Sequence, residues 1–87
     1  MLLIFYFTYS IQTAILMSTA MNGLYKQLGE KVKKARTKAG FTQEELANKA
    51  GLHRTYIAGI ETGRRNISVK SLEKIAKALD VKTNDLL

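Results

Sequence analysis

Residues 43–62 read QEELANKAGLHRTYIAGIET, and this spacing of small and apolar residues predicts a helix-turn-helix. Two short helices joined by a tight turn can cross steeply only where little bulk lies between them. Ala47 supplies a small residue on the inner face of the first helix, and Gly51 tolerates the positive φ that the turn requires. The apolar residues that would hold the second helix in place are Leu52, Ile57 and Ile60.

Signals on both sides of this stretch predict further helices and an all-α fold of five helices. The first helix would begin near Leu24 and end at Gly40, and the helices of the central motif would cover about 43–50 and 54–62. Thr42 and Glu45 form a capping box before the second helix, Ser68 would cap the fourth, and Thr83 would cap a short fifth. The predicted inward-facing residues are Leu24, Leu28, Val32, Ala35, Ala39, Leu46, Ala47, Ala50, Ile57, Ile60, Val69, Leu72, Ile75, Ala76 and Leu79. The short last helix would contain Leu86 and Leu87.

Composition excludes several classes of site. The 87 residues contain no cysteine and one histidine, so disulfides, thiolate metal sites and multi-histidine metal sites are excluded. No nucleophile–base–orienter set, paired-carboxylate motif or phosphate loop is present, so we expect no catalytic residue, no metal and no cofactor. Fourteen Lys and Arg against seven Asp and Glu give a net charge of +7, which favours nucleic acid first and an anionic membrane second.

The N-terminal segment differs from the rest, because residues 1–25 carry no charge and every charged residue lies at or after Lys26. Four interpretations compete for residues 1–23, which we separate from a domain at 24–87. The segment is long enough for a membrane anchor, which the lysines that follow would orient. The second interpretation is a secretory signal, but the segment lacks the basic region and the cleavage site of such a signal. The segment could also be a mis-assigned start before Met21, or an extra helix or arm.

The text FTQEELANKAGLHRTYIAGIETGRRNISVKSLEKIAKALDV, residues 41–81, carries a family resemblance. Residues 28–87 resemble the Xre/Cro-type helix-turn-helix proteins, which have a phage-repressor-like fold of five helices. Within that family, LHRTYIAGIE followed by RRNISVKSLEKI is most similar to the controller proteins of restriction–modification systems.

The resemblance implies a cytoplasmic, nucleoid-associated regulator of transcription that binds double-stranded operator DNA as a homodimer and regulates its own gene. RNA polymerase is a candidate partner. We expect the dimer to form through the C-terminal region, where the apolar residues are Leu79, Val81, Leu86 and Leu87.

The second helix of the motif would read bases from its first turn. Opposite its apolar face lie small residues, which let a helix enter the major groove deeply; they are Thr55, Ala58, Gly59 and Thr62. We predict that Arg54 reads guanine O6 and N7 and that Thr55 and Tyr56 make hydroxyl contacts to the DNA. The alternative for Arg54 is a phosphate contact, and for Tyr56 it is a place against the preceding helix.

Other residues are predicted to contact the DNA backbone or to hold the fold. Gln43 begins a helix whose free amides favour a phosphate, and the resemblance implies the same role. The further predicted backbone contacts are His53, Thr62, Arg64, Arg65 and Asn66, with a solvated loop as the alternative for the last three. The resemblance also implies a partly buried salt bridge between Arg36 and Glu61.

Two rival functions remain open at this point. Antitoxins of toxin–antitoxin pairs often share this fold, and the N-terminal segment would then be a partner-binding arm. A membrane-tethered regulator is the second rival. An enzyme is the weakest of the interpretations.

Overall fold

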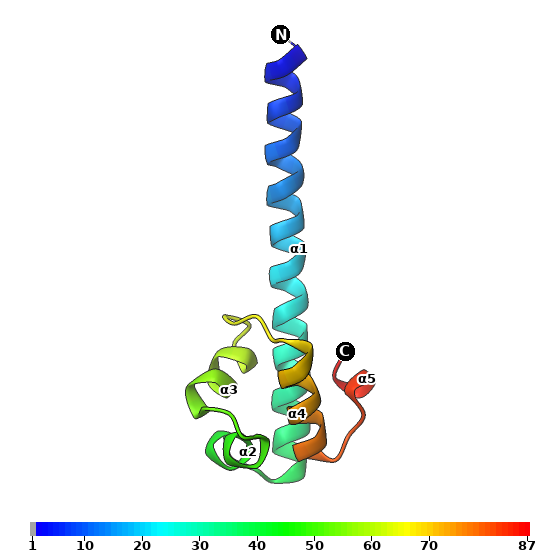
Figure 1. Cartoon of the computed structure of the whole chain (residues 1–87). Helices are drawn as coiled ribbons and strands as arrows, with labels where there is room; N and C mark the ends of the chain where they lie inside the picture. Colours follow the sequence, from blue (N-terminus) through cyan, green and yellow to red (C-terminus); the bar gives the residue numbers. More distant parts are fainter. Residues whose placement is uncertain (1) are drawn as a thin grey trace.

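The protein is built from helices alone over the residues that the structure, a computed structural model, describes, which are 2–87 (Figure 1). Within this range the helices are α1 (Leu2–Ala39), α2 (Gln43–Ala50), α3 (Arg54–Glu61), α4 (Val69–Leu79) and α5 (Thr83–Leu86). The predicted all-α fold of five helices is therefore confirmed.

Helix α1 is much longer than the predicted first helix. Its second half packs against α3, α4 and α5, and Val32 is completely buried there. The expected start at Leu24 is wrong because the helix continues back to Leu2 without a break. The inward placement of Leu24 is also wrong, since this side chain is exposed, as is Ala39 at the other end. The fold meets α1 from about Lys26 onward, where Gly63 approaches the helix, so little of the domain covers Leu24.

The caps of α2 and α4 explain where these helices begin. The Thr42 hydroxyl accepts the backbone N–H of Glu45 at 3.1 Å, and the Glu45 carboxylate accepts the backbone N–H of Thr42 at 3.1 Å. Ser68 accepts the backbone N–H of Ser71 at 3.1 Å. Both predicted caps are confirmed.

The predicted cap of α5 is displaced by one residue. Thr83 is the first residue of the helix, and Lys82 occupies the cap position. The backbone N–H of Lys82 donates to the Asp85 carboxylate at 3.1 Å. The Asp85 carboxylate, at the third position of the helix, therefore accepts the backbone N–H of the cap residue, as Glu45 does at the start of α2.

The core is formed where the apolar faces of α2, α3 and α4 meet the second half of α1. Its buried apolar residues are Val32, Leu46, Ala47, Ala50, Ile57, Ile60, Leu72, Ile75, Ala76, Leu79 and Leu86. Outside α1, the predicted inward residue Val69 is exposed instead, because it lies at the very start of α4 and at the edge of its buried sector. Leu87, which was expected in the last helix, follows α5 and is exposed.

The predicted turn between α2 and α3 is present. Ala47 is 1% exposed between the helices, and Gly51 ends α2 with φ of 69°. The backbone N–H of Leu52 donates to the Ala47 carbonyl at 2.9 Å, which closes the turn. The α3 helix ends at Glu61, one residue before the predicted end, and Thr62 is its C-cap.

The first half of α1 projects beyond the other helices as a single rod (Figure 1). The large apolar side chains described there are exposed, as Phe5 at 79% illustrates. By length and hydropathy alone this helix qualifies as a candidate membrane span, with mean hydropathy of 1.2 over the best window and none of that window buried.

Candidate nucleic-acid interface

The outer face of α3 presents small or extended polar side chains to solvent. Arg54 and Thr55 are exposed in its first turn, on the side away from the completely buried Ile57. Ala58 and Gly59 follow on the exposed side and are half-buried. Apart from Arg54 and Arg65, the side chains on this face are small, which lets the helix approach a groove closely.

Tyr56 lies between the two environments that the sequence left open. Its ring is half-buried and packs against the core cluster. Its hydroxyl donates to the backbone carbonyl of Asn66 at 3.4 Å, in the loop that follows α3. The hydroxyl oxygen is still able to accept a hydrogen bond, so both an anchoring role and a DNA contact are compatible with this position.

Gly59 leaves room for the side chain of Arg65. A Cβ atom at Gly59 would lie 2.7 Å from Arg65 Cγ, closer than side-chain atoms approach one another. The Gly59 carbonyl also accepts the backbone N–H of Arg64 at 2.9 Å and that of Arg65 at 3.3 Å. The stem of Arg65 therefore crosses α3, and the loop is anchored to the helix. From the sequence, Gly59 was expected to let the helix enter the major groove, and this contact with Arg65 was not predicted.

Several of the residues that are predicted to contact DNA line one concave surface. That surface is lined by Gly51, Leu52, His53, Thr55, Tyr56, Arg65 and Ser71. His53 is the N-cap residue of α3, and its exposed side chain makes no capping hydrogen bond. Its ring is therefore available for a partner.

The hydroxyl group of Thr62 forms its hydrogen bonds within its own helix. Its hydroxyl lies 3.1 Å from both the Ala58 and the Gly59 carbonyl oxygens, so its proton is used within α3. Only the lone pairs of this oxygen are left, and they cannot donate to a phosphate. Of the predicted backbone contacts, Thr62 is the one whose local hydrogen bonds favour a structural role.

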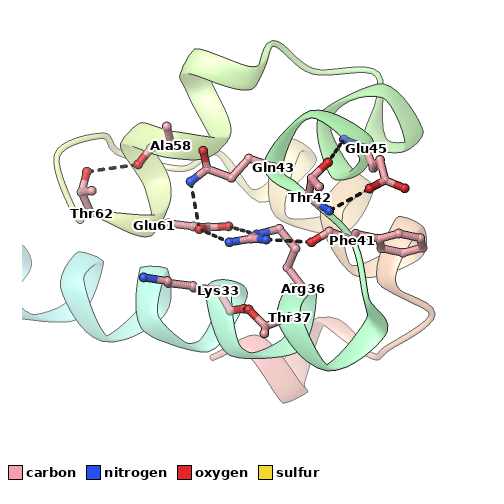
Figure 2. A network of polar contacts seen from close by, with 10 residues as sticks. All are labelled: Lys33, Arg36, Thr37, Phe41, Thr42, Gln43, Glu45, Ala58, Glu61 and Thr62. Carbon is pink, nitrogen blue, oxygen red and sulfur yellow. Dashed lines mark hydrogen bonds and ion pairs between the residues drawn. The ribbon is translucent and has the colours of Figure 1, made fainter.

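The start of α2 is joined to α1 and α3 by a polar network (Figure 2). Arg36 Nε donates to Glu61 Oε2 at 2.6 Å, and Arg36 Nη2 donates to Glu61 Oε1 at 3.0 Å. Arg36 Nη1 donates to the Phe41 carbonyl at 2.7 Å, and Gln43 Nε2 donates to Glu61 Oε1 at 3.1 Å. The hydrogen bond to Glu61 raises the pKa of Arg36, an effect that partial burial opposes. The Arg36–Glu61 pair that the resemblance implied is thus present, and it reaches Gln43 as well.

The basic side chains around α3 have no ion-pair partner within residues 2–87. The salt bridge there joins Arg36 and Glu61, whereas Arg54, Arg64 and Arg65 are exposed and unpaired. Cations that no carboxylate neutralises retain their attraction for phosphate. No group of three or more His, Asp or Glu side chains among the described residues could hold a metal ion.

Comparisons with known proteins agree with this geometry. The helix-turn-helix family matches residues 32–86. The chain is 48% identical over 67 residues to Control protein C.BamHI of Bacillus amyloliquefaciens, which covers 76% of this chain and 83% of that protein. It is 40% identical over 67 residues to Control protein C.MunI of a Mycoplasma species, which covers 76% of this chain and 90% of that protein.

A solved structure shows the same arrangement of helices. The restriction-modification controller protein C.AhdI from Aeromonas hydrophila superposes with a TM-score of 0.74 at 37% identity, covering 75% of this chain and 98% of that one. The family match begins at residue 32, and nearly all of C.AhdI is accounted for by three quarters of this chain. The exposed N-terminal rod is therefore additional to the shared fold.

Proposed function

This chain belongs to the helix-turn-helix family of DNA-binding transcriptional regulators, and from that premise we propose that it is the controller of a restriction–modification system. The observation that carries the proposal is the 48% identity to a control protein over 67 residues, because a 67-residue stretch of this 87-residue chain must include the DNA-binding motif at residues 43–62. The family consists of DNA-binding regulators and not of enzymes, so the protein acts by occupying DNA.

The base-reading residues in this proposal are those of the first turn of α3. Arg54 donates to guanine O6 and N7 in the major groove, a pairing that discriminates guanine from other bases. Thr55 and Tyr56 contact a neighbouring base or phosphate through their hydroxyl groups. The exposure of Arg54 and Thr55, and the small residues behind them, support this assignment.

The phosphate contacts flank α3 on both sides. The start of α2 contributes Gln43 and free backbone amides, which favour an anion. The other proposed contacts are His53, Thr62, Arg64, Arg65 and Asn66, with the hydroxyl of Thr62 limited by its bonds within α3. These contacts set the orientation of the protein on the duplex, and the first turn of α3 sets its sequence preference.

Two copies would bind one operator, because one recognition helix reads only a few base pairs. Half-sites would then lie about 34 Å apart, one turn of the duplex. The expected apolar patch needs revision, because Leu79 and Leu86 are buried within the protomer. The proposed contact is instead an apolar groove between α1 and α5, in which Leu24 and Leu87 are exposed. The other residues that line it are Tyr25, Gln27, Leu28, Lys31 and the buried Leu86.

Regulation follows from where the dimer lies. Bound in the cytoplasm to nucleoid DNA upstream of its own gene, it would govern its own transcription, with RNA polymerase as the neighbouring partner. Expression of a restriction endonuclease would then be delayed until the controller has accumulated.

A footprint on the DNA upstream of the gene tests the proposal. We expect protection of two half-sites about one helical turn apart. Affinity should fall by about 10³- to 10⁵-fold between 50 and 200 mM salt if six to ten phosphates are contacted. A chain that protects no site there, or whose binding does not depend on salt, contradicts the proposed function.

A further inference from the structure

The buried carboxylate of Glu61 holds donors from two other parts of the fold. Its side chain is 2% exposed, and Arg36 and Gln43 share its Oε1 at 3.0 and 3.1 Å. We propose that Glu61 is a positioning residue for DNA binding: through this shared oxygen it orients the Gln43 side chain toward a DNA phosphate. The inference rests on the proposed function, since it concerns how the DNA-binding surface is arranged.

The chemistry of the two groups sets the orientation of the amide. An ionised carboxylate only accepts hydrogen bonds, so the nitrogen of the Gln43 amide and not its oxygen must face Glu61. One N–H of that nitrogen is used at 3.1 Å, and the second is directed away from the carboxylate. A glutamine without such a partner would rotate between several conformations and lose freedom on binding.

Gln43 belongs to the end of α2 that carries free backbone donors. Gln43 is the first residue of α2, where backbone amides lack intrahelical acceptors. The cap at Thr42 accepts the amide of Glu45 and leaves those of Gln43 and Glu44. An oriented side-chain donor at this position therefore adds to the backbone donors that an approaching phosphate would meet.

Arg36 makes the arrangement compatible with an anion nearby. A bare carboxylate at the start of α2 would repel a phosphate, and the two hydrogen bonds from Arg36 compensate that charge. Its third hydrogen bond, to the Phe41 carbonyl at 2.7 Å, ties the pair to the turn before α2. The network thus fixes the phosphate-binding end of α2 relative to the end of the base-reading helix α3 (Figure 2).

The first test uses the unmodified full chain without DNA. Side-chain amide ¹⁵N relaxation should show the Gln43 amide to be as restricted as the backbone, whereas the exposed amide of Gln12 on α1 should move freely. A Gln43 amide as mobile as that of Gln12 overturns the inference. This measurement decides the matter even where a substitution at Glu61 prevents folding.

The second test measures operator affinity for Glu61→Gln, Gln43→Ala and the double variant, with circular dichroism establishing that each is folded. Glu61→Gln should weaken binding about 3- to 10-fold, although it removes a negative charge. The double variant should bind no more weakly than Gln43→Ala alone, because Glu61 acts through Gln43.

The matched control is Glu73→Gln, which removes the same charge from an exposed position on α4. It should leave affinity unchanged or tighten it slightly. Additive losses in the double variant, or a Glu61→Gln variant that binds as tightly as Glu73→Gln, overturn the positioning role while the regulator function stands. An unmodified chain that binds no duplex overturns the function itself, and this inference with it.

Discussion

The two halves of α1 form one continuous helix, yet their environments are opposite. Residues 26–39 carry nearly half of the chain's basic charge and place Val32 in the core at 0% exposure. Residues 2–25 carry no charge, and Leu16 on that half is 70% exposed. Continuity of a helix therefore does not define a domain. A domain is defined by the elements that pack against one another, and here the other elements cover α1 only from about Lys26 onward.

The difference between the halves is energetic as well as geometric. A helix gains most of its stability in a protein from the face that it buries. The second half buries such a face against α3, α4 and α5. A substitution that lowers the free energy of unfolding in the domain should therefore change it very little in the rod. Matched pairs of variants can test this contrast.

The largest effect is expected from truncating a core side chain. Leu46→Ala should lower the free energy of unfolding by about 2–5 kcal/mol, because Leu46 is completely buried and its removal leaves a cavity. The same change at the exposed Leu16 should stay within about 0.5 kcal/mol. Urea denaturation of the full chain measures both, and equal losses would mean that the rod is part of the cooperative core.

A pair of glycines on α1 sharpens the contrast. A Cβ at Gly29 would collide with the Ile60 carbonyl oxygen, so Gly29→Ala should cost about 1–3 kcal/mol of unfolding free energy. No atom lies within 4 Å of a Cβ at Gly23, where alanine should favour the helix by up to about 1 kcal/mol. Thermal unfolding followed by circular dichroism separates the two. A tolerated Gly29→Ala would contradict the close approach of α1 and α3.

DNA recognition should be confined to the packed domain. Arg54→Ala should weaken operator binding by about 1–3 kcal/mol and relax the preference at one base position. Competition with operators altered one base pair at a time measures this relaxation. An equal loss of affinity on operator and scrambled DNA would show that Arg54 contacts phosphate and does not read a base.

The smallest effect is expected in the rod itself. Phe7 is 66% exposed, so Phe7→Ser should change the unfolding free energy by less than about 0.5 kcal/mol. Operator affinity should also be unchanged, because the predicted DNA contacts all lie in residues 43–66. Gel-shift titration of the two full chains checks this. A clear loss of affinity would place the rod at the DNA.

The helix-turn-helix was predictable because short-range signals agree there. The capping box at Thr42, the small residue Ala47 and the turn at Gly51 are each local requirements that the structure meets. The apolar spacing on α3 likewise placed Ile57 in the core and Arg54 outside. Such features depend on residues a few positions apart, so the sequence carries them directly.

The features that the sequence did not predict depend on distant parts of the chain. The start of α1 was placed too late, because the periodic pattern marks where a helix is covered and not where it begins. Arg65 over Gly59, and Gln43 on Glu61, join residues whose contact requires the tertiary fold. The cap at Lys82 was missed because the sequence prediction looked for a capping hydroxyl, at Thr83, whereas the helix start is held by the Asp85 carboxylate, which accepts the backbone N–H of Lys82.

Selection of random-sequence duplexes by the purified full chain tests the central claim most directly. If the exposed first turn of α3 reads base pairs, the selected DNA should converge on a two-fold symmetric site with half-sites about 34 Å apart. The Arg54→Ala chain should select the same site with one position in each half relaxed. Duplexes that show no common sequence, bound with equal affinity at low salt, would contradict the account.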